Sequence, residues 1–428
     1  MEKTNKSVHK AMIPGNNRQI NAPRGIYYGY IIVLLMVVIQ IVMYSQRSSF
    51  GVFIKPLENE FGWSRALITG AFSFSTIVQG FSAIIMGGLN DRVGPRITLT
   101  LCGFLTGLGL LLISCINSAW QLYLYYTILI GLGMGGLTSP LMSTVVKWFV
   151  KRRNVMTSMI LVGGGIGGLI GPPVINWLIN NQGLRDCFTI LGISVLFGAI
   201  LSAQFLKLDP SKIGQLPYGK WEETSKPYSN VSGLSLVNAI HTKQFWMVAG
   251  AIFCFGFVAS IIITHIVPYA TDLGISTSTA ANILAITNGA LSFGAIIIGV
   301  IADRIGVRRS SILCFTLLSV VLFLLLPVNN SWLIALFTLF TGIGSGGISA
   351  LLPAMTAEFF GMKFHGLILG VFVLSYTVGM AIGSFTGGYL SDIYHDYFLT
   401  FLFGTILSFT GLLLVIILRA DKKVIDPT

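Results

Sequence analysis

The sequence predicts an all-α membrane protein with twelve transmembrane helices arranged as two six-helix halves. Hydrophobic residues make up 54% of the 428 residues and charged residues only 10%, whereas a soluble domain carries about a quarter charged residues. The apolar residues form twelve runs that can each cross a hydrocarbon core of about 30 Å, and one ten-residue pattern occurs twice. This combination excludes a soluble enzyme, a secreted disulfide scaffold and a disordered protein.

The twelve apolar runs must be helical, because lipid offers the backbone amides no hydrogen-bond partner. In the first half the predicted spans are 27–50, 65–89, 97–116, 120–146, 155–179 and 187–206. In the second half they are 244–268, 277–301, 310–328, 332–356, 366–390 and 398–418.

Polar segments precede, separate and follow the two halves, which are predicted over residues 27–206 and 244–418. Residues 1–26 lack the continuous apolar run of a signal peptide, so they predict a cytoplasmic tail. Residues 207–243 read as a cytoplasmic linker and residues 419–428 as a second cytoplasmic tail. With this orientation 23 of the 27 Lys and Arg residues face the cytoplasm, a bias that predicts a multi-pass protein of the cell membrane.

The repeated pattern is G-x-x-x-D-R-x-G-x-R, and it supports a division into two related halves. It occurs at residues 87–96 and again at 299–308, at an offset of 212 residues, each time after the second helix of its half. Internal duplication is typical of secondary transporters, whose substrate site lies between the repeats. No phosphate-binding loop, haem site or metal-ligand cluster accompanies it. We therefore expect no cofactor, no metal and no enzymatic activity.

The repeated loop resembles the hallmark of the major facilitator superfamily. Three further segments are similar to signatures of its monocarboxylate transporter and oxalate–formate antiporter branch. They are 27–30 at the start of helix 1, 148–153 entering helix 5 with the glycine-rich stretches 163–168 and 171–172 that follow within that helix, and 212–219 in the linker. The resemblance implies the major facilitator fold and a carrier whose halves rock about a central site. It also implies a monocarboxylate as substrate.

The chain departs from that branch at its usual second-half cation. The branch's helix 8 arginine would fall at Ala295 and an aspartate one turn earlier at Leu291. The helix 11 lysine of the oxalate exchanger has no counterpart between His365 and Leu390. These departures keep open a dicarboxylate, a neutral metabolite or a drug as the substrate.

Arg47 is the candidate anchor for the substrate. It lies in the outer part of helix 1 within the polar stretch 45–49, and a guanidinium can hold a carboxylate through two parallel hydrogen bonds. By resemblance, the helix 1 cation of the branch falls within a residue of this position. The alternative is that Arg47 extends to the outer lipid headgroups. None of the fifteen acidic residues falls at the predicted bilayer centre, which favours an anion site over a cation-coupled one.

Other polar residues in the spans could line a wet cavity or bond between helices. The candidates for substrate contact are Gln79, Tyr123, Tyr126, Asn282, Asn288 and Tyr376. His265, at the end of helix 7, could carry a proton with the substrate, or it could simply bond to a neighbouring loop. The remaining histidines, His9, His241, His365 and His395, are expected to be solvated in tails or loops.

The repeated loops predict a gate on the cytoplasmic side, in which carboxylates accept hydrogen bonds from helix ends and arginines bridge the halves. The predicted gating residues are Asp91, Arg92, Arg96, Asp303, Arg304, Arg308 and Glu358. The alternative for the arginines is that they only fix topology by staying inside.

The sequence thus predicts a secondary active or facilitative transporter of a small organic anion, by uniport, exchange or symport. Its partners would be that anion and the lipid bilayer, with no nucleic acid, and we expect a monomer. A rival from another class is a non-transporting membrane sensor on the same fold, for which the predicted tails offer no signalling domain.

Overall fold

The computed structural model describes residues 27–219, 233–326, 330–394 and 397–418. The predicted tails, 1–26 and 419–428, lie outside the described residues, as does part of the predicted linker. Within the described part the chain is almost entirely helical, with two isolated β-bridges. Twelve of its helices are long and apolar enough to cross a membrane, so the predicted fold class is confirmed.

The first six spans form one half of the molecule, and the fourth is built from several short pieces. The continuous helices are α1 (Tyr28–Ser48), α2 (Phe50–Phe61), α3 (Arg65–Val93), α4 (Pro95–Ile113), α8 (Arg153–Gln182) and α9 (Leu184–Gln204). The fourth span comprises α5 (Ala119–Leu122), the π-helix η1 (Tyr123–Ile130), α6 (Gly131–Met134), the 3₁₀ turn η2 (Gly135–Leu137) and α7 (Ser139–Trp148).

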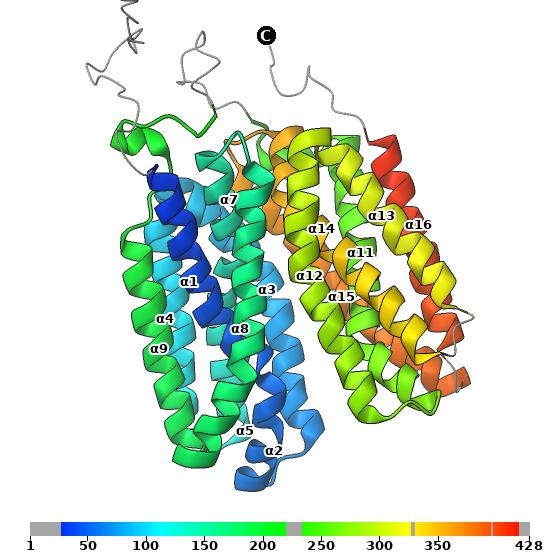
Figure 1. Cartoon of the computed structure of the whole chain (residues 1–428). Helices are drawn as coiled ribbons and strands as arrows, with labels where there is room; N and C mark the ends of the chain where they lie inside the picture. Colours follow the sequence, from blue (N-terminus) through cyan, green and yellow to red (C-terminus); the bar gives the residue numbers. More distant parts are fainter. Residues whose placement is uncertain (1–26, 220–232, 327–329, 395–396, 419–428) are drawn as a thin grey trace, which may run out of the picture.

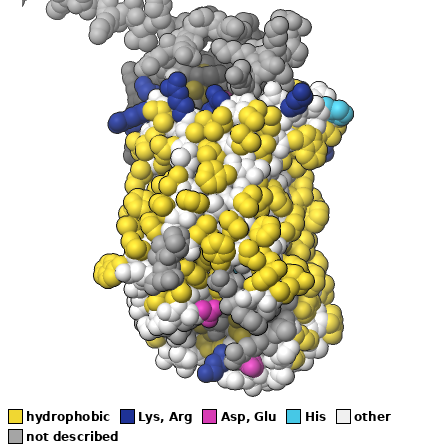
Figure 2. Space-filling view, turned by 90° about the vertical axis from the view of Figure 1, so that its right-hand side faces the viewer, with side chains coloured by type: hydrophobic (Ala, Val, Ile, Leu, Met, Phe, Trp, Pro, Cys, Tyr) yellow, Lys and Arg dark blue, Asp and Glu magenta, His cyan; other side chains and the backbone are white. Residues whose placement is uncertain are grey.

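The other six spans form the second half, which stands beside the first in Figure 1. They are α11 (Lys243–Asp272), α12 (Thr277–Ile305), α13 (Val307–Leu325), α14 (Ser331–Phe360), α15 (His365–Tyr394) and α16 (Phe398–Ile417). Two short elements lie between the halves, the 3₁₀ turn η3 (Pro210–Ile213) and α10 (Leu236–Ile240). Figure 2 shows hydrophobic side chains covering the middle of one face, with Lys and Arg mainly at one end and both basic and acidic side chains at the other.

The first helix differs from its prediction, which ended it at residue 50. After a break at Ser49, where ψ is 5°, α2 continues for another 12 residues, or about 18 Å of helix. Because polar residues in α2 interrupt the apolar run, the length of that run did not predict this continuation. Its apolar face is buried through Phe50, Phe53 and Leu57. Arg47 therefore does not stand at the outer end of the first helix.

The repeated pattern also differs from a simple loop. Helix α3 runs through Asp91 to Val93, a single turn follows at Gly94, and α4 starts at the next residue. The second copy repeats this geometry at Gly306. The φ angles of the two glycines are +94° and +91°, a left-handed conformation that favours glycine. Each copy thus makes a sharp helix-to-helix corner.

The halves meet at one end of the bundle. We call the end that holds Tyr28, Asp91 and Asp303 the motif end, and the opposite end, which holds Gly62 and Gly183, the distal end. Close contacts between the halves occur where residues 80–91 of α3 face 366–377 of α15, and where 154–165 of α8 face 292–299 of α12. Figure 1 shows the two halves diverging toward the distal end.

Glycine makes the closest of these approaches possible. A Cβ atom on Gly87 would overlap the carbonyl of Gly366, and one on Gly370 would overlap the backbone of Ala83. The backbones of α3 and α15 therefore touch without intervening side chains, as small residues allow in membrane helices. This seam fixes the relative position of the halves at the motif end.

Candidate functional site

Arg47 lies in the last turn of α1, with its side chain half-buried. Its guanidinium has no hydrogen bond or ion pair with any residue that the structure describes. It interacts electrostatically with two tyrosines, Tyr126 of η1 and Tyr376 of α15. These tyrosines belong to opposite halves, so Arg47 faces the space between them. Since α2 continues beyond it, this position does not favour extension to the distal headgroups.

The two tyrosines are held by aromatic packing within their own halves. Tyr126 is 4% exposed, and its ring lies 5.0 Å from that of Phe50. Tyr376 packs on Phe255 of α11 at 5.3 Å. Neither hydroxyl has a hydrogen-bond partner among the described residues. A guanidinium and two phenolic O–H groups thus present donors that the described residues leave unused, a set suited to a carboxylate.

Gln79 supports this region from α3. Its Nε2 donates to the backbone carbonyl of Met134 over 3.3 Å, and Gln46, next to Arg47, donates to the Met134 sulfur over 3.5 Å. The Oε1 atom of Gln79 is buried and has no partner in the described structure. Met134 of the fourth span therefore accepts hydrogen bonds from the first span, through Gln46, and from the second, through Gln79.

The remaining predicted contact residues lie differently. The Tyr123 hydroxyl donates to the carbonyl of Leu67 over 3.0 Å, which ties η1 to α3. Asn282 and Asn288 on α12 are exposed and form no hydrogen bond within the described residues. Nothing in the described contacts brings these three side chains to Arg47.

His265 lies inside the second half. It is 8% exposed, its Nε2 lies 3.0 Å from the carbonyl oxygen of Ser384 on α15, and its ring contacts Tyr397 at 5.6 Å. A Cβ atom on Gly387 would overlap the imidazole, so glycine is needed there. These contacts match the structural alternative for His265, with α15 in place of a loop.

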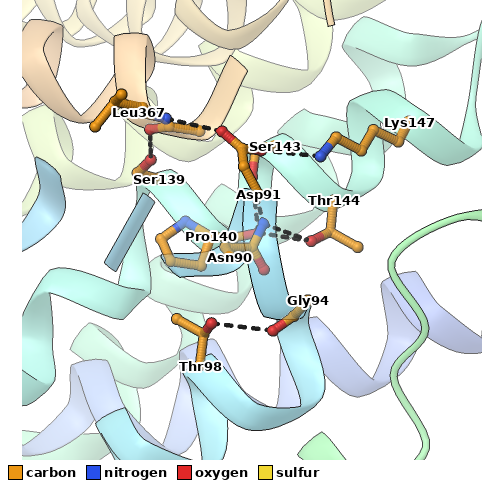
Figure 3. Close-up of polar contacts among 11 residues, drawn as sticks. Asn90, Asp91, Gly94, Thr98, Ser139, Pro140, Ser143, Thr144, Lys147 and Leu367 are labelled. Carbon is orange, nitrogen blue, oxygen red and sulfur yellow. Dashed lines mark hydrogen bonds and ion pairs between the residues drawn. The ribbon is translucent and has the colours of Figure 1, made fainter. Parts of the chain in front are cut away.

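At the motif end, Asp91 ties three helices together (Figure 3). One carboxylate oxygen pairs with Lys147 Nζ of α7 at 2.9 Å. The other accepts a hydrogen bond from the backbone N–H of Leu367, in the first turn of α15, over 3.0 Å. Beside it, the Ser139 hydroxyl donates to the carbonyl of Gly366. The carboxylate thus satisfies a free N–H at a helix start, where the helix dipole also favours it.

Asp303 forms the equivalent contact on the other seam. Its Oδ1 accepts hydrogen bonds from the backbone N–H of Asn154 over 3.3 Å and from Asn154 Nδ2 over 2.7 Å. The hydroxyl of Ser158, one turn further along α8, donates to the carbonyl of Ala295 over 2.6 Å. Arg153 interacts electrostatically with Asp303 and with Glu358 of α14. Each half therefore places its motif carboxylate at the start of a helix of the other half.

The motif arginines do not bridge the halves here, so that prediction is wrong for this conformation. Arg96 donates to Gln204 over 2.8 Å and Arg308 to the carbonyl of Ile416 over 2.6 Å, both within their own halves. Arg92 and Arg304 are exposed and have no partner in the described structure. In this conformation the four arginines therefore make no contact across the seam among the described residues.

The cations at the seam are instead Lys147 and Arg153, which the prediction missed. Both flank the corner between the fourth and fifth spans, inside the segment 148–153 or directly before it. Their signal was present in the branch signature at the entry of helix 5. That signal did not distinguish a contact between the halves from a topological role, because a short basic cluster on the cytoplasmic side fits both.

His365 corrects a second prediction, since it is not solvated. It is the first residue of α15 and its side chain is fully buried, with 0% exposure. Its Nε2 lies 2.8 Å from the carbonyl oxygen of Pro353 on α14. Its position in a predicted loop gave no sign of this burial, because the burial depends on contacts that are distant in sequence: Gly366 and Leu367, which follow it, pack against α3 of the opposite half.

The linker is fastened to both halves at equivalent corners. Tyr218 exchanges backbone hydrogen bonds with residues 148–151, and Leu234 N–H donates to the carbonyl of Phe360 over 2.9 Å. The Tyr27 hydroxyl adds bonds to the carbonyls of Trp148 and Leu216, over 3.0 and 3.1 Å. Burial in this aromatic cluster raises the pKa of Tyr27. The aromatic start of the first helix therefore anchors the linker.

The sequence profile described as Major Facilitator Superfamily matches residues 36–288 and 247–427, which together span most of the chain. The chain belongs to the major facilitator superfamily. Among superfamily relatives, the chain is 27% identical to the oxalate:formate antiporter of Oxalobacter formigenes, over 83% of this chain and 84% of that protein. It is 26% identical to monocarboxylate transporter 13 of Rattus norvegicus, over 87% of this chain and 85% of that one.

Solved major facilitator structures share the fold. The proton:xylose symporter XylE matches with a TM-score of 0.71 at 14% identity, covering 92% of this chain and 96% of that one. The fucose:proton symporter FucP of E. coli matches with a TM-score of 0.72 at 15% identity, covering 92% and 100%. The protein is therefore a multi-pass major facilitator transporter of the branch that holds the monocarboxylate transporters and the oxalate:formate antiporter.

Proposed function

We propose that this transporter carries a small organic anion of the monocarboxylate class by alternating access, with Arg47 as its anchor. The observation that carries the proposal is the half-buried guanidinium of Arg47, which has no hydrogen bond or ion pair among the described residues and interacts electrostatically with Tyr126 and Tyr376. A bound carboxylate would accept two hydrogen bonds from Arg47 and further bonds from the phenols. Because the tyrosines come from opposite halves, one anion could contact both halves at once.

The charge balance of the membrane interior supports an anion. No acidic residue of the sequence falls at the centre of a predicted span, so the positive charge of Arg47 has no counter-ion there. A half-buried guanidinium is only partly hydrated, and a substrate anion would supply hydrogen-bond acceptors for its free N–H groups. The names of the relatives, a monocarboxylate transporter and an oxalate:formate antiporter, support the same substrate class.

We also propose that the motif end faces the cytoplasm, with both chain termini, in the cell membrane. The Lys and Arg bias of the sequence supports this orientation. The site would then be reached from outside in the conformation described, because the halves are joined at the motif end by Asp91 and Asp303. Inward opening would require those contacts to break. Arg92, Arg96, Arg304 and Arg308 stay candidates for contacts made during that step.

The coupling mode stays open between uniport, exchange and symport. A co-transported proton could travel on the substrate or on His265, although the contacts of His265 lie within the second half. Initial uptake with and without an inward-directed pH gradient separates these modes. Symport predicts faster uptake with the gradient, whereas exchange depends on substrate loaded inside.

A second candidate is a major facilitator carrier of another solute, such as a dicarboxylate, a neutral metabolite or a drug. The observation that favours it is the missing second-half cation. Position 295, where the branch places an arginine, is an alanine with 0% exposure whose carbonyl is bonded to Ser158 across the seam. The described site thus has one cation from the first half and none at this position.

Arg47→Ala tests the proposal in proteoliposomes with a panel of radiolabelled monocarboxylates, dicarboxylates and neutral solutes. Removing a charged hydrogen-bond partner costs roughly 2–5 kcal/mol, so we expect uptake efficiency to fall by about 30-fold or more. Arg47→Lys should retain part of the uptake efficiency, because the positive charge stays while the two parallel N–H donors of the guanidinium are lost.

Arg185→Ala is the matched control. Arg185 is another arginine of the first half, and it lies near the distal end. Unlike Arg47, it pairs with an acid, Glu60, at 2.9 Å, and its side chain is 49% exposed. Its loss should leave uptake nearly unchanged. Equal uptake by Arg47→Ala and wild type would reject the anchor, and saturable uptake of neutral solutes alone would favour the second candidate.

A further inference from the structure

The imidazole of His365 is a buried titratable group that the proposed transport site does not use. Its side chain has 0% exposure, and its Nε2 lies 2.8 Å from the carbonyl oxygen of Pro353. A carbonyl only accepts hydrogen bonds, so Nε2 carries the proton of the neutral ring. A second proton would have to bind Nδ1, which is buried without a hydrogen-bond partner in the described structure.

Two cations of the opposite half interact with His365. Lys147 at the end of α7 and Arg153 at the start of α8 both interact with it electrostatically. His365 and its partner Pro353 belong to the second half, whereas both cations belong to the first. A positive charge on the imidazole would therefore repel the other half across the motif-end seam.

The nearby acids are already engaged with other groups and form no hydrogen bond or ion pair with His365 in the described structure. On α3, Asp91 pairs with Lys147 and accepts the N–H of Leu367. On α14, Glu358 interacts with Arg153 and Arg308. If either carboxylate moved to pair with a protonated His365, it would leave Lys147 or Arg153, and that cation at the seam would lose its partner.

We propose that His365 is a pH-sensitive element of the motif-end contact, whose protonation drives the two halves apart at that end. The joined conformation holds the ring neutral by excluding water and by facing it with two cations. Separation of the halves would remove Lys147 and Arg153 and admit water, so the ring could bind a proton. The inference concerns the conformational equilibrium alone and needs no substrate, so it goes beyond the proposed function.

The direction and size of the effect follow from proton linkage. Only the open motif end binds the extra proton, so acid favours that conformation. For a solvated imidazole with a pKa of about 6.5, lowering the pH from about 7.5 to about 5.5 multiplies the ratio of open to joined conformation by roughly ten. The distal end closes as the motif end opens, because the halves move as units.

Spin labels across the distal end can measure this ratio in the full-length protein in detergent micelles. Asn180→Cys at the end of α8 and Asp272→Cys at the end of α11 provide two exposed label positions in opposite halves. Cys115→Ser removes the cysteine that is exposed among the described residues, while the other four are buried. Pulsed electron–electron distance measurements at the two pH values then give the populations without any substrate.

We expect the short-distance population of the wild-type background to rise by about tenfold relative to the long one at the lower pH. His365→Gln should abolish most of this rise, because glutamine can still donate to the Pro353 carbonyl but does not titrate. His241→Gln is the matched control, since His241 is an exposed histidine bonded to Val237 within α10, and the pH response should persist.

Two results would overturn the proposal. One is a wild-type population that does not move between the two pH values, which needs no variant to be folded. The other is an unchanged pH response in a folded His365→Gln protein, judged by its elution volume and melting temperature. The uptake test of Arg47 and the pH test of His365 share no residue. Either proposal can therefore fail while the other stands, and loss of uptake by Arg47→Ala with an intact pH response is the result that both proposals expect.

Discussion

At the scale of single residues, the features of the candidate site are hydrogen-bonding groups that have no partner in the described structure. Arg47, Tyr126 and Tyr376 contribute donors that no other described residue accepts. Tyr123 sits three residues from Tyr126 in the same π-helix, yet its hydroxyl is bonded to Leu67. Neighbouring tyrosines of one element thus differ in whether a ligand could use them.

Phenylalanine substitutions test this difference. Tyr376→Phe and Tyr126→Phe each remove one donor that we place beside the anion, and a hydrogen bond to a charged group is worth about 1.5–3 kcal/mol. We expect the KM for the preferred substrate in proteoliposome uptake to rise roughly tenfold for each. Tyr123→Phe is the control: it should lower thermal stability slightly and leave KM in place. A larger KM change for Tyr123→Phe than for the other two would contradict the arrangement.

Sequence reasoning could find Arg47 but could not separate its possible neighbours. A charge inside an apolar run stands out, since such charges are rare. Tyrosines and amides in the same runs carry no such signal, because their roles depend on which helix lies opposite. His365 was missed for a related reason: its burial comes from the contact between two halves that are far apart in sequence.

At the scale of elements, the fourth span is the irregular one. It passes through a π-helix, a short α-helix and a 3₁₀ turn, while its counterpart in the repeat, α14, is one helix of 30 residues. Side chains of α3 support the irregular backbone: Ser82 donates to the carbonyl of Leu132 over 2.6 Å and Gln79 to that of Met134 over 3.3 Å. Such departures from α geometry often mark functional sites.

Helix positions were predictable, whereas helix irregularity was not. Every predicted span has a helix in place, because the length of an apolar run is set by the thickness of the bilayer. The continuation into α2 was missed because its polar residues break the apolar run. The π-helix was missed because no simple residue pattern distinguishes it.

A glycine substitution tests the seam between α3 and α15. A Cβ atom on Gly87 would overlap the Gly366 carbonyl and the Ser139 hydroxyl, so Gly87→Ala should weaken the joined conformation and enlarge the short-distance population measured across the distal end. Gly289→Ala is the matched control, because no atom lies within 4 Å of its added Cβ. It should leave the populations unchanged, and alanine should stabilise the helix by up to about 1 kcal/mol. Equal populations in both variants would contradict the role of this seam.

At the scale of the whole molecule, the two halves repeat one contact, a motif carboxylate at the start of a helix in the other half, but the residues around that contact differ. Asp91 and Asp303 both accept the N–H groups at the start of a helix in the other half. Around Asp91 the seam adds a lysine and a glycine contact, and around Asp303 it adds Asn154 and Ser158. The repeat in the sequence predicted the two carboxylates. The partners differ between the halves, so symmetry could not predict them.

The fastening of the linker has a consequence for the covalent link itself. Residues 216–218 bond to the corner of the first half and Leu234 to the corner of the second. Each end of the linker is therefore held by its own half. Two polypeptides divided between Gly219 and Gly233, produced together in one cell, should find each other through the glycine seam and co-purify at equal amounts. Affinity capture of one fragment measures this, with Gly87→Ala as the variant expected to reduce recovery. The connection would then serve to deliver both halves together rather than to hold them in register.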